Sequence, residues 1–400
     1  MSFLTTKNTL ILFLVIAVLL LGLARGSPDI KSYDREIEAC KQSENKTICW
    51  KDLVIQVFER DGMGEAYGII ARLYDTIPEF APTCHDFGHF LGNATYELFS
   101  GGKDFKVTAK TAFCSYGFYH GFLERLASEE GGVKGARDFC IYVDQQLAKE
   151  TPDVTLQCFH GIGHGWVNVH DVPELWGNEE GIVKRGLELC ERVAGNDSEL
   201  SRCATGVFNG IATFYGTREY NLKLNRDDPL WLCRKQTEKY KDPCFISMNV
   251  ALVAAADGDL VRAAKFVDAI NEDEYAKHAM LNLAIPFGVE NLHSSDHTQA
   301  ILDCRSLSPR LRISCIQGYA FAFLESGKPG EEYIKPIEFC SLSILSSQEK
   351  EGCLGYIFGY LAQWYPREKA LGICDLSNDS QKEFCKRSVE NSLKGLEAQK

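Results

Sequence analysis

Five of the nine histidines in this chain lie in three short segments that resemble one another. Each segment combines a cysteine, one or two histidines and small residues at similar spacings. The five histidines are His85, His89, His120, His160 and His164. Histidines four residues apart lie on one face of a helix, and imidazoles from neighbouring helices can complete a transition-metal site. The sequence therefore predicts a polar site, and most simply a metal site, in the first half of the chain.

Glu124 adds a carboxylate to this set because it lies four residues after His120, on the same face of a helix. It could serve as a fourth ligand or as a general base. Zinc suits a set of imidazoles with a carboxylate, and copper and iron suit it as well. If the site is catalytic, we expect hydrolysis by a metal-activated water with Glu124 as the base. The sequence has no His-Glu-x-x-His, so no metallopeptidase motif supports zinc.

Two other interpretations of the histidines stay open. They could form a metal-free acid–base or ligand site, or they could be hydrogen-bonded core residues with a structural role. His293 and His297 repeat the four-residue spacing, but Pro286 and the intervening serines indicate a loop or a helix start. Polar histidines in loops are commonly solvated, so a second metal site is not expected there.

The cysteines mark the elements that must position the histidines. One set of cysteines closes an apolar stretch, and another set opens the next stretch 11 to 18 residues later. The closing residues Cys304, Cys340 and Cys374 recur every 34 to 36 residues. A period of this size with two apolar segments per unit predicts a stacked array of helical hairpins. Small residues three and seven positions after most opening cysteines, with the register shifted slightly at Gly88/Gly92 and Gly355/Gly359, predict closely packed inner helices.

A disulfide between the closing and the opening cysteine would join the two helices of each hairpin. We expect seven local bridges and one bridge between the two remaining cysteines. The pairs are Cys40–Cys49, Cys84–Cys114, Cys140–Cys158, Cys190–Cys203, Cys233–Cys244, Cys304–Cys315, Cys340–Cys353 and Cys374–Cys385. Val267 and His278 stand where a further pair would fall, which predicts a hairpin without a bridge. No Cys-x-x-Cys occurs, so structural disulfides are predicted over zinc knuckles.

In period and in helix-pair layout, residues 130–395 resemble the tetratricopeptide and Sel1-like class of helical-repeat proteins. The resemblance implies an all-α fold, an α-solenoid with a concave face, and it implies no activity. The tryptophan, tyrosine and proline signature of tetratricopeptide units is absent. The alternative to a metal-binding or hydrolytic protein is therefore a non-enzymatic scaffold, whose concave face binds a peptide or a cell-surface partner.

Composition restricts the partners and the compartment. The net charge of −12 and the isoelectric point near 5.3 exclude nucleic acid as an expected partner. Sixteen cysteines predict an oxidising, extracytoplasmic compartment. The apolar run at residues 10–24 predicts a signal peptide or an uncleaved anchor, the only expected contact with a membrane. We expect an export segment at residues 1–26, histidine-bearing repeats at 27–220, and continuous repeats at 221–400.

Overall fold

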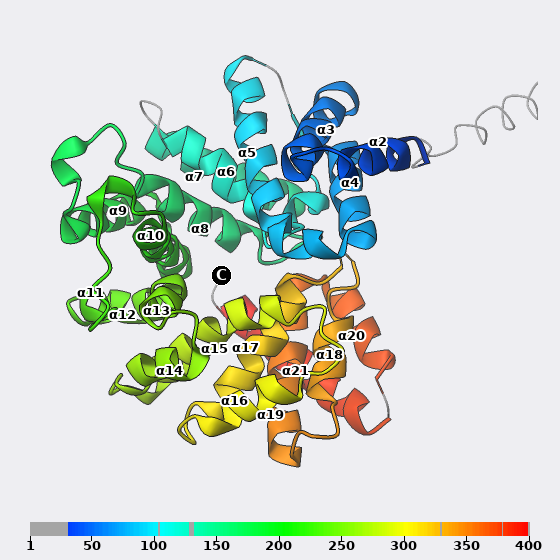
Figure 1. Ribbon diagram of the computed structural model, residues 1–400, viewed down its shortest axis with the longest axis vertical. Helices are drawn as coiled ribbons and strands as arrows, with labels where there is room; N and C mark the ends of the chain where they lie inside the picture. Colours follow the sequence, from blue (N-terminus) through cyan, green and yellow to red (C-terminus); the bar gives the residue numbers. More distant parts are fainter. Residues whose placement is uncertain (1–30, 103–104, 128–131, 329, 378, 399–400) are drawn as a thin grey trace, which may run out of the picture.

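The computed structural model describes residues 31–102, 105–127, 132–328, 330–377 and 379–398, and throughout them the regular elements are helices (Figure 1). The predicted all-α fold is thus confirmed. In this part of the chain, no helix combines the length and the apolar character that a membrane crossing requires. The predicted export segment lies outside the described residues.

The chain begins with α2 (Lys31–Lys41), α3 (Lys46–Asp61) and α4 (Met63–Thr76), and then forms hairpins. One helix of most hairpins packs against its counterparts in the neighbouring hairpins, and these helices form an inner layer. These inner helices are α5 (Cys84–Ser100), α6 (Gly117–Ala127), α8 (Val154–Trp166), α10 (Asp197–Thr217), α12 (Glu238–Ser247), α13 (Asn249–Ala255), α15 (Asp273–Glu290), α17 (Arg312–Glu325) and α19 (Ser347–Trp364).

The outer helices of the hairpins cover this inner set. They are α7 (Gly132–Leu147), α9 (Glu179–Val193), α11 (Trp231–Arg234), α14 (Leu260–Asp268), α16 (Thr298–Ser306), α18 (Ile334–Cys340) and α20 (Arg367–Asp375), and α21 (Asp379–Ala398) packs last against α19 and α20. Short 3₁₀ segments lie at η1 (Pro78–Thr83), η2 (Ala109–Ala112), η3 (Pro173–Leu175) and η4 (Glu219–Asn221). The boundary expected at residue 220 falls within η4, and α10 still packs against α12 across it.

All eight predicted disulfides are present, and they bridge the hairpins as expected. The bridge between Cys84 and Cys114 joins the start of α5 to the segment before α6. The hairpin of α14 and α15 has no bridge, as predicted from Val267 and His278. Val267 is buried there, and the His278 ring bonds Asp242 instead. In a chain-entropy account, each loop of 11 to 18 residues closed by a bridge adds about 3 kcal/mol of stability.

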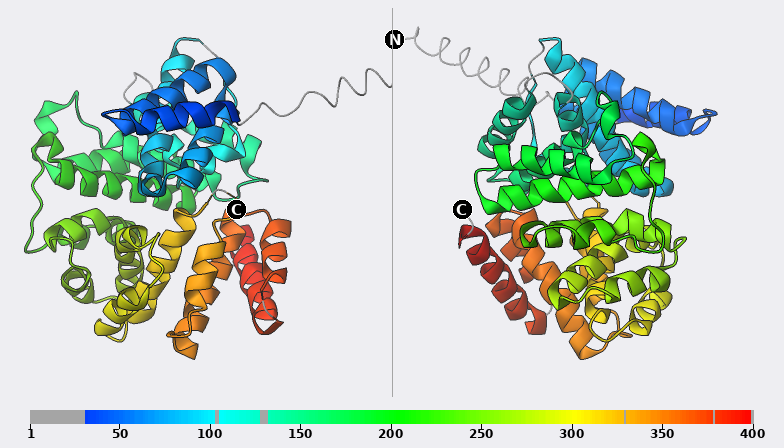
Figure 2. Two further views of the ribbon diagram at one scale, coloured as in Figure 1. Left: turned by 45° about the vertical axis from the view of Figure 1, so that its right-hand side comes forward. Right: turned by 90° about the vertical axis from the view of Figure 1, so that its left-hand side faces the viewer.

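The stack of hairpins curves until its second half meets its first half, which encloses the concave face that a solenoid would expose (Figure 2). The Tyr74 hydroxyl on α4 donates a hydrogen bond to the carbonyl oxygen of Ser326, after α17. The Asp153 amide donates to the carbonyl oxygen of Gln363 on α19 at 3.1 Å. Tyr116 packs against Trp364 with ring centres 5.9 Å apart. The solenoid is therefore closed on itself, which the repeat alone did not predict.

Glycines bring the four inner helices α5, α6, α8 and α10 into backbone contact. A Cβ atom added at Gly121 would overlap the carbonyl oxygen of His89, and one added at Gly206 would overlap that of His160. These glycines belong to the small-residue stripe of the sequence. They set the spacing of the helices that carry the histidines.

Replacing Gly206 with alanine is expected to lower the free energy of unfolding by about 2 kcal/mol or more, because the clash is with backbone and α10 must move away from α8. Gly359, within α19, is the matched control because an added Cβ atom meets nothing within 4 Å. Alanine there should be neutral or stabilise by up to about 1 kcal/mol. Denaturant unfolding with the bridges intact measures both, and equal effects would contradict the packing argument.

Candidate functional site

The closed array surrounds a chamber of about 450 Å³, lined by side chains from α4 through α19. This volume lies within the range of about 300–1,000 Å³ that is common for small-molecule sites. His85, His120 and His160 line the chamber from α5, α6 and α8. The lining thus joins the two halves of the chain around one space.

The structure brings all five predicted histidines together, with His120 in the centre. From the His120 ring, the ring centres of His85 and His160 are both 5.0 Å away, and that of His164 is 5.2 Å away. The His89 ring lies at 6.2 Å. His89 and His164 stand one turn further along α5 and α8 than His85 and His160. The expected adjacency of three histidine-bearing helices is therefore present.

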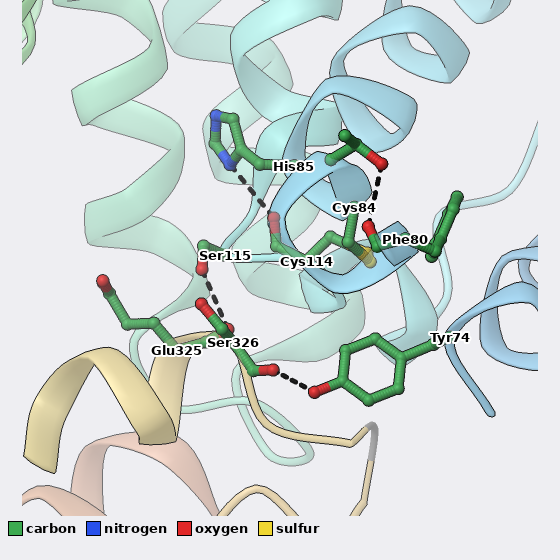
Figure 3. Close-up of a disulfide and its surroundings, with 9 residues drawn as sticks. Tyr74, Phe80, Cys84, His85, Cys114, Ser115, Glu325 and Ser326 are labelled. Atoms are coloured by element: carbon green, nitrogen blue, oxygen red, sulfur yellow. Dashed lines mark hydrogen bonds between the residues drawn. A yellow bond between two sulfur atoms is a disulfide. The ribbon is translucent and has the colours of Figure 1, made fainter. Parts of the chain in front are cut away.

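Two of the chamber histidines have their tautomer fixed by hydrogen bonds. His85 Nδ1 lies 3.1 Å from the carbonyl oxygen of Cys114, which can only accept, so Nδ1 carries the proton (Figure 3). His160 Nδ1 lies 2.8 Å from the hydroxyl oxygen of Thr205. That hydroxyl donates its own proton to the carbonyl oxygen of Arg202 at 2.6 Å, so it accepts from His160. Both imidazoles consequently keep an available lone pair on Nε2.

Glu124 accepts two hydrogen bonds from the cluster. Its Oε1 lies 3.1 Å from His89 Nε2 and 2.8 Å from His164 Nδ1. Burial alone would raise the pKa of Glu124, but the hydrogen bonds from His164 and His89 outweigh it and lower the pKa to about 2. A carboxylate with so low a pKa is a weak base at neutral pH. Here Glu124 orients two imidazoles, and its role as a general base stays a prediction.

The chamber histidines are neutral at physiological pH. Burial is the main cause that lowers the pKa of His85, to about 4, and the nearby His89 adds to it. Burial likewise lowers the pKa of His120 and His160 well below the usual value. His120 is 8% exposed, and within the described chain it has ring contacts but no hydrogen bond. Neutral imidazole is the form that coordinates metals and accepts hydrogen bonds.

No three His, Cys, Asp or Glu side chains of the described residues already stand in the arrangement of a metal site. His170 and His297 make their contacts away from the cluster. His170 is exposed and bonds Asp171. His297 packs on Phe323 and Phe339, with ring centres 5.1 and 5.4 Å away.

Sequence reasoning missed the opposite wall of the chamber. Glu325 on α17, and Tyr356 and Tyr360 on α19, all line it. Arg202 on α10 was missed as well, and it lines the chamber on the histidine side, three residues before the Thr205 that bonds His160. Arg202 forms an ion pair with the buried Asp153 at 3.3 Å. No spacing in the sequence connects these residues to the histidines, because only the closure of the array places α17 and α19 across from them.

No family model matches this chain, and no curated relative matches it. Among solved structures, it is similar to a circular tandem repeat protein with novel repeat topology and enhanced subunit contact surfaces. The two share 14% identity over 92% of each chain, with a TM-score of 0.19. At that TM-score the likeness does not bear on the fold, which rests on the helices and bridges described above.

Proposed function

We propose that this protein binds a transition-metal ion at the chamber wall through His85, His120 and His160. The donor set suits zinc, and copper and iron are the competing ions. Two imidazoles on one zinc ion, with Zn–N bonds of about 2.1 Å, have ring centres about 5 Å apart. The His120 ring lies 5.0 Å from each of the other two rings. Since the side chains are not already arranged as a metal site, binding requires the rings to rotate.

The observation that carries the proposal is that Nδ1 of His85 and Nδ1 of His160 each donate a hydrogen bond within the protein. Metal-bound histidines commonly donate the proton of the second ring nitrogen to a carbonyl or another acceptor, which orients the coordinating nitrogen. His85 donates to the Cys114 carbonyl oxygen, and His160 donates to the Thr205 hydroxyl oxygen. The hydrogen bonds support Nε2 as the coordinating atom in both residues, and the chamber supplies space for an exogenous ligand beside the metal.

We also propose that the protein is exported from the cytoplasm. Eight disulfides indicate an oxidising environment outside the cytoplasm. Secretion, or anchoring by residues 10–24, stays a prediction of the sequence. The rival scaffold function, with its tetratricopeptide or Sel1-like resemblance, also stays a prediction. It is less well supported, because the concave face that would bind a peptide is closed by the contact between the two halves.

Metal titration tests the proposal. The protein is produced without a polyhistidine tag in an oxidising compartment, stripped with chelator, and titrated with Zn²⁺ by calorimetry and with Co²⁺ by absorption spectroscopy. We expect one ion per chain and a loss of at least about 100-fold in affinity for His120→Ala, because one of three ligands is removed. His170→Ala is the matched control and should bind as the wild type does.

A second variant keeps the test decisive if His120→Ala fails to fold. His160→Asn retains an amide that can donate to Thr205 and removes Nε2, so it should keep its helix content and lose metal affinity. No stoichiometric binding to the wild type, or equal binding by the wild type and a folded His120→Ala or His160→Asn protein, would refute the metal site. The histidines would then form a metal-free acid–base or ligand site, or a structural network.

A further inference from the structure

The chamber wall formed by α17 and α19 is aromatic and carries one carboxyl group. Phe321 and Glu325 lie four residues apart on α17, and Tyr356 and Tyr360 lie four residues apart on α19, so each pair shares a face. The Phe321 ring centre lies 4.6 Å from that of Tyr360 and 5.9 Å from that of Tyr356. The two tyrosine rings are 5.2 Å apart. All four side chains line the chamber.

The carboxyl group of Glu325 has no hydrogen-bond or ion-pair partner in the described chain. Its backbone carbonyl oxygen accepts a hydrogen bond from the Ser115 hydroxyl at 3.0 Å, which fixes the end of α17. Figure 3 shows the side chain extending away from that contact, with no dashed line at its carboxyl group. Burial raises the pKa of Glu325 to about 7, against the opposing effect of Arg202. The group thus faces the chamber without a partner among the described residues.

The charges around Glu325 do not neutralise it. Arg202 is a cation whose charge acts on it, and Arg202 forms its ion pair with Asp153. Asp153 is only 5% exposed and depends on that pair. When Glu325 is ionised, the three groups carry a net charge of −1. Uncompensated buried charge is costly, so a cation in the chamber would stabilise the ionised carboxylate.

From this geometry we infer that the chamber binds a small organic cation, an amine or a quaternary ammonium, with its charged head between Glu325 and the rings of Phe321, Tyr356 and Tyr360. Aromatic faces attract ammonium groups through the ring quadrupole, and a carboxylate supplies the counter-charge. Leu281 and Ile285 on α15 also line the chamber and offer apolar contact for the organic part. The inference goes beyond the proposed metal site and does not depend on it.

The test uses choline and its neutral carbon isostere, 3,3-dimethylbutan-1-ol, with phenethylamine as the primary-amine probe. Calorimetry and ligand-observed NMR are performed on the bridged protein in chelator, so that no metal contributes. We expect choline or phenethylamine to bind with a dissociation constant of about 1 mM or tighter. The neutral isostere should bind at least about tenfold more weakly, because it lacks the charge but keeps the shape.

Three variants assign the contacts. Glu325→Gln should weaken binding of the cation at least about tenfold, by removing the counter-charge. Tyr360→Ala should weaken it about fivefold or more, whereas Tyr360→Phe keeps the ring and should match the wild type within about twofold. The inference fails if neither cation binds, or if choline and its isostere bind with equal affinity. It also fails if Glu325→Gln weakens Zn²⁺ binding and leaves the affinity for the amine unchanged. Loss of metal binding in His120→Ala with amine binding retained would uphold both sites as independent.

Discussion

Replacing Glu124 with alanine is expected to lower the free energy of unfolding by about 2–4 kcal/mol at pH 7, because it removes the acceptor of two partly buried hydrogen bonds. His89 Nε2 and His164 Nδ1 both donate to Glu124 Oε1. The His89 side chain is 28% exposed, the His164 side chain 12% and the Glu124 side chain 23%. Each N–H would lose its partner in a confined space. Denaturant unfolding in chelator, with the bridges intact, measures the effect without metal.

The pH dependence of the Glu124 contribution has a definite sign. The pKa of Glu124 is about 2 in the folded protein and 4.5 as an ordinary glutamate. A carboxyl group with a depressed folded pKa stabilises the protein above the unfolded pKa and loses that contribution as the pH falls. The stability difference between the wild type and Glu124→Gln should therefore be largest above pH 4.5 and should shrink toward pH 2.

Glu97→Ala is the matched control for this prediction. Glu97 pairs with Arg125 across two exposed side chains, and such surface pairs contribute about 0–1 kcal/mol. If Glu124→Ala costs no more than Glu97→Ala, the two histidine hydrogen bonds do not stabilise the cluster. The orientation of His89 and His164 would then need another cause.

Features that repeat along the chain were predictable from the sequence, because each depends on residues close in number. The pairing of Cys304 with Cys315 follows from a short loop between two helices. The approach of α8 and α10 follows from small residues such as Gly206. The gathering of His85, His120 and His160 follows from their positions on three consecutive inner helices. These relations are local in sequence, and the regular stacking of the hairpins places the residues close together in the folded protein.

The closure of the array was not predictable in the same way. The Ser115 hydroxyl bonds the Glu325 carbonyl oxygen across 210 positions, and Tyr74 bonds Ser326 across 252. Such contacts depend on the small rotation between successive hairpins, which adds up over the array. No residue spacing in the sequence records the size of that rotation. The aromatic wall was missed for this reason. Thr205 was also missed, because its role comes from the position of its hydroxyl between His160 and the Arg202 carbonyl oxygen.

Glu325→Gln is expected to stabilise the protein at alkaline pH by up to about 3 kcal/mol and to have little effect near pH 4.5. Burial raises the pKa of Glu325 to about 7 from an ordinary 4.5. A carboxyl group with a raised folded pKa binds its proton more tightly in the folded state, so the wild type loses stability as the pH rises from 4.5 to 7. At pH 7 the folded carboxyl group is half ionised, and the loss of stability levels off about one pH unit higher. Glutamine cannot ionise, so the variant avoids this loss.

Unfolding free energies of the two proteins at pH 4.5, 6, 7 and 8.5 provide the measurement, in chelator and without amines. The other charged or titratable groups that act on Glu325 are Arg202, Asp153, Tyr356 and Tyr360. Because both proteins contain these groups, their own titration largely cancels in the difference.

Glu331→Gln, at an exposed position, should show no such pH trend. A difference that stays constant with pH would mean that Glu325 has an ordinary pKa, with solvent or a protein partner at its carboxyl group. Choline added at pH 8.5 should reduce the advantage of the variant, because the bound cation stabilises the ionised wild type more than the variant.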